Sequence, residues 1–201
     1  MVNLDGERFI DEGADFRNYT YAKYGAEVLK QPSGVAFQIF DARSVPLLRT
    51  IDYEAPGATR ADADTLAELA AALEIDPERF ERTVREFNAA IVPGDFDPAV
   101  KDGVRTEGLA VPKSNWALPI DTPPFTAFPI TCGITFTFGG LRVDADARVL
   151  DLAGRPLPGL YAAGELVGGI FYFNYPGGSG LCSGSVFGKI AGTSAGRAKA
   201  N

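Results

Sequence analysis

Two stretches near the middle of the chain show the hydrophobic spacing of amphipathic helices. In the first, the apolar positions fall at i, i+3, i+4 and i+7, and they are Leu66, Leu69, Ala70 and Leu73. Residues at this spacing share one face of a helix. Asp62 and Asp64 precede the run, and their carboxylates are candidate N-caps. We therefore expect a helix that begins after one of these two aspartates.

The next apolar run also has near-helical spacing, and its members are Phe80, Val84, Phe87 and Ile91. Asp76-Pro77 stands before it and combines an N-cap residue with a proline at the first helical position. Pro93 follows the run and ends the pattern. We expect a second helix here, and we assign both helices a structural role.

Three segments precede these helices. Residues 18–30 predict a helix that stops before Pro32, and residues 35–40 predict a strand that ends at Asp41. Residues 7–12 follow an Asp-Gly turn signal and predict a short strand. The ordinary interpretation of this part is an α+β unit whose aromatic residues lie in its core.

The region after the two helices is rich in turn residues. Residues 93–130 contain seven prolines, so we expect loops there and place a domain boundary near Asp121. Residues 131–138, 141–144 and 149–152 then alternate with glycine and aspartate turns, which predicts short antiparallel strands.

The last third of the chain begins with a short apolar run, residues 160–163, that is compatible with a buried strand. A loop rich in glycine and aromatic residues follows, and then glycine recurs every four residues at Gly180, Gly184, Gly188, Gly192 and Gly196. On a helix these glycines form one stripe. Each interior glycine costs about 1 kcal/mol relative to alanine, and the usual compensation is close approach of the backbone to something flat.

Several segments together resemble a known family. They read GLYAAGE at 159–165, GG at 168–169, NYPGGSGL at 174–181, TFGGL at 137–141, and a longer segment at 3–25. They are similar to the C-terminal flavin-binding segment of the fumarate reductase/succinate dehydrogenase flavoprotein superfamily, and the most similar branch is that of the tricarballylate dehydrogenase-like enzymes.

The resemblance implies an FAD-dependent oxidoreductase of α+β class. Residues 1–120 would form a substrate-covering (capping) domain that is incomplete at its N-terminus, and residues 121–201 the C-terminal part of the FAD-binding α/β domain. The implied reaction dehydrogenates or reduces a C–C bond next to a carboxylate, with a polycarboxylate of the tricarballylate or fumarate type as substrate. An electron-acceptor protein is a conceivable partner.

The chain lacks one motif that such enzymes use. No G-x-G-x-x-G turn, which holds the FAD pyrophosphate at a helix N-terminus, follows a strand in the sequence. We therefore expect the C-terminal part of a longer flavoenzyme, inactive alone and dependent on a missing N-terminal FAD-binding half.

The resemblance assigns four residues to the cofactor: Gly164, Glu165, Gly180 and Leu181. Glu165 would accept hydrogen bonds from FAD hydroxyls, and Gly180 and Leu181 would start a helix under the flavin ring, where its N-terminus favours negative charge. Thr137, Gly178 and Ser179 would contact substrate. A surface glutamate and a plain glycine turn are the ordinary alternatives.

Tyr175 is the main candidate for chemistry in this part of the chain. Fumarate reductases carry a substrate-binding arginine at its place, whereas steroid-dehydrogenating relatives have the Tyr-Pro-Gly turn seen here. Phe136 stands where fumarate reductases have a histidine, which makes a strict fumarate site doubtful. The alternative interpretation of Tyr175 is one more aromatic residue beside Phe171, Tyr172 and Phe173.

The first part of the chain offers three ionisable catalytic candidates, Glu12, Arg17 and Arg43. Fumarate reductases use a Glu/Arg pair and a further arginine in the capping domain for proton transfer. Glu12 matches by its Arg-Phe-x-x-Glu setting, and Arg17 matches approximately. Arg43 lies near the third position, although strict register puts Val45 there. Ordinary surface charge is the alternative for each.

Composition narrows the function further. The net charge is −7, with 26 acidic and 19 basic residues, which argues against nucleic acid and anionic membrane surfaces as partners. The chain has no histidine, which excludes histidine-based nucleophile systems and histidine metal sites, and we expect no metal. No apolar run approaches a membrane span. Two cysteines without a secretion signal suggest reduced thiols and a cytoplasmic protein.

Two other functions remain open. The first is a 3-ketosteroid dehydrogenase-like flavoenzyme, which Tyr175 and the lost arginine and histidine favour. The second is a non-catalytic fragment or binding module that assembles with a separate dinucleotide-binding partner.

Overall fold

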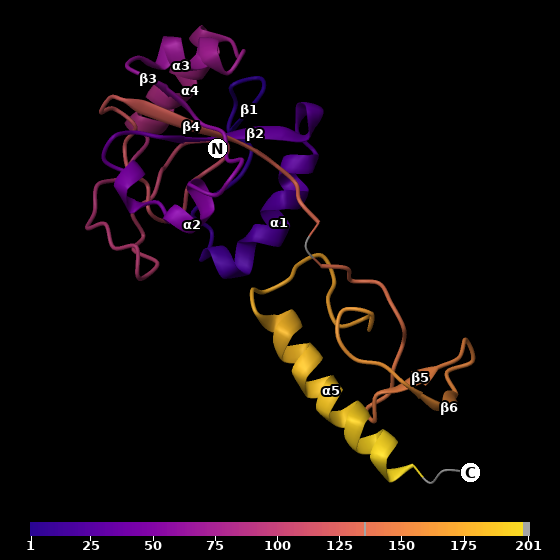
Figure 1. Cartoon of the computed structure of the whole chain (residues 1–201). Coiled ribbons are helices and arrows are strands. Elements are labelled where there is room, and N and C mark those ends of the chain that lie inside the picture. The colour runs from indigo at the N-terminus through magenta and orange to yellow at the C-terminus, as the bar shows by residue number, and fades with distance from the viewer. Residues whose placement is uncertain (135, 199–201) are drawn as a thin grey trace. The chain divides into compact units, whose positions relative to one another are not determined.

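The computed structural model describes residues 1–134 and 136–198 and divides them into two compact units. The first unit comprises Met1–Arg17 and Tyr24–Cys132, and the second comprises Asn18–Lys23 and Gly133–Asn201. Both units combine helices with strands, so the α+β class is confirmed (Figure 1). We expected a domain boundary near Asp121, whereas the first unit continues for eleven more residues, to Cys132.

The first unit is organised on an antiparallel sheet of four strands in the order β1-β2-β4-β3. These strands are β1 (Val2–Asn3), β2 (Val35–Phe40), β3 (Ala61–Ala63) and β4 (Phe125–Thr131). β4 pairs with β2 from Val35↔Thr131 to Phe40↔Thr126 and with β3 at Ala61↔Ala127. The first unit continues past the expected boundary because β4 is a central strand of this sheet.

The prediction of loops over residues 93–130 is wrong at its end, because Phe125–Thr131 form strand β4 although this segment contains Pro129. β3 pairs only with Phe125–Ala127, so Pro129 lies beyond the last residue of β4 that β3 contacts. A proline, which has no N–H to donate, is tolerated at such a position. The prolines in and before this segment led us to predict a loop where the chain forms a strand.

The helices of the first unit are α1 (Arg17–Leu29), α2 (Thr50–Tyr53), α3 (Leu66–Ala72) and α4 (Pro77–Ala89), with short 3₁₀ turns at Pro32–Gly34 and Val45–Leu47. The predicted strand at 35–40, helix after Pro77 and N-cap at Asp76 are confirmed. Residues 18–23 of α1 cluster with the second unit.

Two local predictions for this unit are wrong. Residues 7–12 are all described and form no strand, because Asn3 Oδ1 accepts hydrogen bonds from the N–H groups of Asp5 and Glu7 and holds a turn instead. Helix α3 is capped by Thr65, whose hydroxyl pairs with the Glu68 backbone in a capping box, and Asp62 lies in β3.

The core of the first unit lies between the sheet and the helix pair α3–α4 (Figure 1). Phe37 and Ile39 of β2 and Ala127 of β4 contact Leu69 of α3 and Phe80 of α4 in one buried cluster. The apolar periodicity of both helices therefore marks their buried faces.

The second unit has one strand pair and one long helix. β5 (Arg148–Leu150) and β6 (Pro156–Tyr161) are antiparallel, and α5 runs over Ser179–Arg197. β6 overlaps the strand expected at 160–163 but begins earlier and ends at Tyr161. The expectation that this strand is buried is wrong, because five of the six residues of β6 are exposed. Around 141–144 only isolated bridges form, Leu141↔Val167 and Val143↔Val149, and Thr135 in the strand expected at 131–138 lies outside the described residues.

No helix within the described ranges 1–134 and 136–198 combines the length and hydropathy that crossing a membrane requires.

Phe80 is fully buried in the core of the first unit, so Phe80→Ala should lower the free energy of unfolding of that unit by about 3–5 kcal/mol. Urea denaturation followed by circular dichroism measures this difference. Ile51→Ala is the control, because Ile51 is 73% exposed and its truncation should change stability by less than about 0.5 kcal/mol. Equal effects of the two substitutions would contradict the placement of the core.

Candidate functional site

The Tyr175 side chain is held by a helix terminus and by other aromatic rings. Its hydroxyl accepts a hydrogen bond of 3.0 Å from the backbone N–H of Gly180, in the first turn of α5. Its ring stacks on Phe136 with centroids 4.7 Å apart, and Phe171 meets it edge-on at 5.0 Å. Phe138 lies at the border of the same cluster, 6.4 Å from Tyr175. The predicted catalytic residue is therefore part of an ordered aromatic site.

Gly180 is required by this arrangement. A Cβ atom at Gly180 would lie 2.4 Å from the Tyr175 hydroxyl oxygen and 2.6 Å from the Phe136 ring. Neither contact can be relieved by a small shift, because both rings are packed. The N–H of Gly180, a predicted cofactor residue, donates to the Tyr175 hydroxyl.

The loop that carries Tyr175 is fastened to a segment far away in sequence. The N–H of Gly177 donates to the carbonyl of Asn18 at 2.7 Å, and the Asn174 side-chain amide donates to the carbonyl of Tyr19 at 2.9 Å. Tyr21 adds an edge-on contact to the Tyr175 ring at 6.0 Å. No sequence pattern pointed to these contacts, because two of them use backbone atoms of the early segment.

The start of α5 turns through the two small residues that we assigned to substrate. Gly178 is the N-cap residue, with φ of +85°, and it provides no side-chain cap. Such a backbone conformation favours glycine. The Ser179 hydroxyl donates to the carbonyl of Pro176. Leu181, assigned to the cofactor, projects an exposed side chain from the same turn.

Glu165 and Thr137 form a second contact within this unit. The Glu165 carboxylate accepts hydrogen bonds from the Thr137 N–H at 2.8 Å and from its hydroxyl at 3.2 Å. Gly164, just before Glu165, has φ of +82°. The structure thus joins one predicted cofactor residue directly to one predicted substrate residue.

Glu12 lies in a buried ionic cluster of the first unit. Its carboxylate pairs with the Met1 amino group and, at 2.7 Å, with the Arg8 guanidinium. Burial alone would raise the pKa of Glu12, but the Met1 ammonium, Arg8 and Lys113 together lower it to about 2. Glu12 is therefore ionised at neutral pH and bound to its cationic neighbours.

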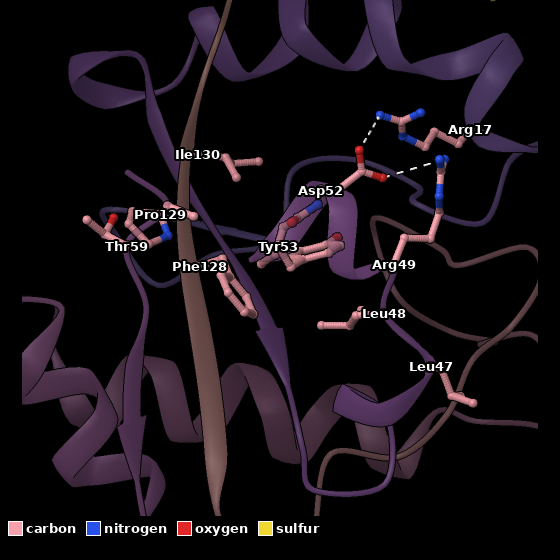
Figure 2. A pocket seen from close by; sticks show the side chains of 12 residues that line it. Arg17, Leu47, Leu48, Arg49, Asp52, Tyr53, Thr59, Phe128, Pro129 and Ile130 are labelled. Atoms are coloured by element: carbon pink, nitrogen blue, oxygen red, sulfur yellow. Dashed lines mark hydrogen bonds and ion pairs between the residues drawn. The ribbon is translucent and has the colours of Figure 1, made fainter. Parts of the chain in front are cut away.

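Arg17, in the same unit, forms an ion pair with Asp52 at 3.3 Å (Figure 2). Asp52 also faces Arg49, with 3.5 Å between the nearest nitrogen and oxygen. All three residues line a pocket of this unit. Nothing in the sequence spacing indicated that Arg49 would join Arg17.

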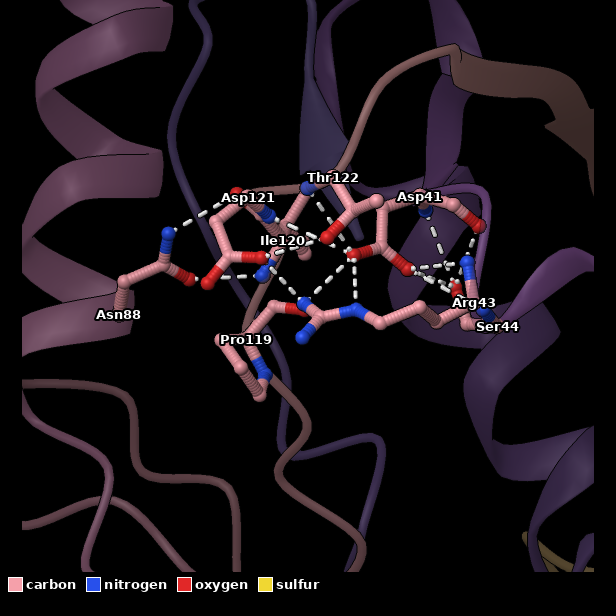
Figure 3. A network of polar contacts seen from close by, with 8 residues as sticks. All are labelled: Asp41, Arg43, Ser44, Asn88, Pro119, Ile120, Asp121 and Thr122. Carbon is pink, nitrogen blue, oxygen red and sulfur yellow. Dashed lines mark hydrogen bonds and ion pairs between the residues drawn. The ribbon is translucent and has the colours of Figure 1, made fainter.

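Arg43 is the centre of a polar network with Asp41 (Figure 3). Its Nε and Nη2 donate to one oxygen of Asp41 at 3.0 and 2.8 Å, and Nη2 also donates to the carbonyl of Pro119 at 3.0 Å and to Asp121. The Asp41 carboxylate, 1% exposed, further accepts from Ser44. Arg43 therefore fastens the segment after β2 to the segment before β4.

The three ionisable candidates of the first unit are not brought into one site. Glu12, Arg17 and Arg43 each have different carboxylate or cationic partners within that unit. In the second unit the aromatic site and the Glu165–Thr137 contact are the two places where predicted residues meet.

Comparison with known proteins identifies the family. Residues 1–181 match the model of the family described as FAD binding domain. The chain belongs to this family. FAD is accordingly the cofactor to which the site residues relate.

Three proteins illustrate the range of this flavoprotein's relatives. A probable fumarate reductase, Ifc3, of Shewanella frigidimarina is 32% identical over 97% of this chain and 30% of its own length. The 4-oxocyclohexanecarboxylate 2-dehydrogenase of Sinomonas cyclohexanicum is 31% identical over 88% of the chain and 33% of its own length. The crystal structure of 3-ketosteroid Δ1-dehydrogenase from Sterolibacterium denitrificans superposes with a TM-score of 0.70 at 26% identity, over 98% of this chain and 38% of that one. The flavoprotein chain thus spans about a third of the length of these relatives.

Two separate features of the second unit are compatible with a bound group such as FAD. The glycine stripe of α5 is bare, because a Cβ at Gly188, Gly192 or Gly196 would meet no described atom within 4 Å. The buried Oδ1 of Asn174 has no hydrogen-bond donor among the described residues. Because buried polar atoms are nearly always hydrogen-bonded, this oxygen is a candidate acceptor for a donor group of a ligand.

Asp41→Asn should remove charge-assisted hydrogen bonds while keeping the side-chain shape. Burial tends to raise the pKa of Asp41, but the hydrogen bonds from Arg43 and Ser44 hold it below its ordinary value. The stabilisation is therefore complete above the ordinary carboxyl pKa and is lost as the pH falls through the folded-state value. We expect Asp41→Asn to lower the free energy of unfolding by about 2–3 kcal/mol at pH 7. The expected effect is smaller than for a fully buried ion pair, because Arg43 is half exposed.

The measurement is the free energy of unfolding of the wild type and the variant at pH 7 and at pH 3. The difference between the two proteins should shrink at the lower pH. Asp62→Asn is the control, since Asp62 pairs with Arg60 at an exposed site and should lose less than about 1 kcal/mol. A difference for Asp41→Asn that is independent of pH would contradict the charged network.

Proposed function

We propose that the chain is the C-terminal part of an FAD-dependent oxidoreductase that dehydrogenates or reduces a C–C bond next to a carbonyl or carboxylate group. In this proposal the first unit covers the substrate and the second is the C-terminal part of the FAD-binding domain. FAD, when bound, would supply the hydride-transfer chemistry of this reaction. The family membership and the relatives that act on fumarate or on ring ketones support this class of reaction.

The observation that carries the proposal is the geometry of Tyr175. Its oxygen accepts the Gly180 N–H, so the phenol proton is left to donate to another oxygen. Aromatic rings on two sides exclude water and restrict the ring to one orientation. A phenol held in this way orients a substrate carbonyl oxygen and takes part in the proton transfer that accompanies hydride transfer.

The remaining site residues have supporting roles in the proposal. One oxygen of Glu165 accepts hydrogen bonds from the backbone N–H and the hydroxyl of Thr137, and its other oxygen accepts hydrogen bonds from hydroxyl groups of the cofactor. Gly178 and Ser179 give the backbone close access to the ligands, and Leu181 and Gly164 contact the flavin part. Glu12, Arg17 and Arg43 stay predicted catalytic residues, and Arg17 lines a pocket of the first unit.

A polycarboxylate of the tricarballylate or fumarate type is the second candidate substrate. The similarity to fumarate reductases favours it. Phe136 and Tyr175 stand where that resemblance requires a histidine and an arginine, and Arg43 is bound to Asp41 and Asp121. These substitutions favour a substrate that presents a neutral carbonyl to the second unit. An electron-acceptor protein and a cytoplasmic location belong to the same proposal.

The first test is the absorbance spectrum of the purified chain, alone and joined to the nucleotide-binding part of a related flavoprotein. The joined protein should show flavin bands near ~375 and ~450 nm, and an anaerobic substrate should bleach them. We expect bleaching by 4-oxocyclohexanecarboxylate rather than by tricarballylate. Absence of flavin from both proteins would support the non-catalytic binding module.

Tyr175→Phe in the joined protein should lower the rate of flavin bleaching about 100-fold, because the phenol proton is lost while the ring stays packed. The FAD content should be unchanged. Tyr172→Phe is the matched control, since Tyr172 is 81% exposed in the same loop, and it should retain the wild-type rate. A wild-type rate for Tyr175→Phe would refute the assigned role.

A further inference from the structure

The pocket of the first unit has no role in the function described so far. It has a volume of about 430 Å³, within the size range of small-molecule sites, and it is open to solvent at Arg17 and Arg49, whose side chains are 58% and 60% exposed. Its walls come from β2, β4, the 3₁₀ turn at Val45–Leu47, α2 and the following loop. Figure 2 shows Arg17, Asp52 and Arg49 together on one side of this pocket, whereas Phe128 and Pro129 lie on the other.

The polar side of the pocket has more cationic than anionic groups. Asp52 is the one carboxylate among the lining residues, and it faces the two guanidiniums of Arg17 and Arg49. The Arg49–Asp52 distance of 3.5 Å exceeds that of a charge-assisted hydrogen bond. A guanidinium can bind a carboxylate with two parallel hydrogen bonds, so Arg49 has capacity for a second carboxylate.

The opposite side of the pocket is mostly apolar, with Phe128 and Pro129 of β4, although Thr59 lies beside them (Figure 2) and Gln38 also lines the pocket. The Tyr53 ring packs edge-on against Phe128 with 4.8 Å between centroids. Tyr53 and Gln38 both line the pocket. Leu48 and Ile130 extend this surface. Such a wall favours the hydrocarbon part of a ligand.

The number of cations limits the charge of the ligand. Among the twelve lining residues the cationic ones are Arg17 and Arg49, and both stand at the same side (Figure 2). A second carboxylate on the ligand would therefore face Tyr53, Phe128 and Ile130, where burial of a charge is costly. A ligand with one carboxylate at the end of a compact apolar body can place the carboxylate at the arginines and the apolar body against Tyr53 and Phe128.

We propose that this pocket binds a small monocarboxylate with a compact hydrocarbon body, its carboxylate on Arg49 and Arg17 and its body against Tyr53 and Phe128. That the pocket binds such an acid does not depend on the proposed function, but that the acid is the substrate does. This binding mode narrows the substrate class to acids with a single carboxylate, whose reacting carbonyl is a neutral group elsewhere in the molecule.

The test is a titration of the full, isotope-labelled chain with cyclohexanecarboxylate, followed by NMR. We expect saturable shifts of the backbone amides of Phe128 and Ile130. The neutral analogue cyclohexanemethanol and the triacid tricarballylate should each bind at least about tenfold more weakly. Equal binding of the alcohol, or shifts confined to other residues, would overturn the proposal.

Arg49→Gln should weaken binding of cyclohexanecarboxylate about tenfold, because it removes the guanidinium and keeps a polar side chain. Arg60→Gln is the matched control, since Arg60 pairs with Asp62 and does not line the pocket. It should change the affinity by less than about twofold. Identical effects of both substitutions would refute the role of Arg49.

The failure of this site can be told apart from a failure of the proposed function. If the chain binds the acid as described but the joined flavoprotein is not bleached by any oxo acid, the site stands and the proposed reaction is wrong. If bleaching occurs and Arg49→Gln leaves both the affinity and the bleaching unchanged, the reaction stands and this site is wrong.

Discussion

The close approach of Tyr175 to Gly180 determines the arrangement of the second unit. The phenol oxygen accepts a backbone N–H of the first turn of α5, and no side chain fits at that position. The loop that carries Tyr175 must therefore run beside the helix terminus, where Asn174 and Gly177 fasten it to residues 18–19. The same contact satisfies one N–H of the helix start. A polar group is thus held among aromatic rings without losing its proton-donating capacity.

The charged residues of the first unit illustrate the opposite principle. Glu12 and Arg43 have the residue types that proton transfer needs, yet each is surrounded by partners that keep it in one ionisation state. Residue type and local motif do not reveal all of these partners, because Lys113, beside Glu12, and Asp121, beside Arg43, come from distant segments.

The structure separates what local sequence could predict from what it could not. Asp76-Pro77 and the apolar spacing after it predicted α4, because capping and periodicity are local properties. β4 was missed because Pro129 looks incompatible with a strand until its pairing partners are known. Thr65 was overlooked as an N-cap in favour of nearby aspartates. In the candidate site, the resemblance selected Tyr175 and Glu165, but the contacts with Phe136 and Thr137 depend on chain folding.

The two units offer different chemistry to a ligand. The pocket of the first unit has paired guanidiniums beside an apolar wall, and the aromatic site of the second has a phenol that donates one hydrogen bond. Guanidinium favours a carboxylate, whereas a single neutral donor among aromatic rings favours a ketone oxygen. A polycarboxylate suits neither site, because each would hold an additional carboxylate against aromatic rings, where burying a charge is costly.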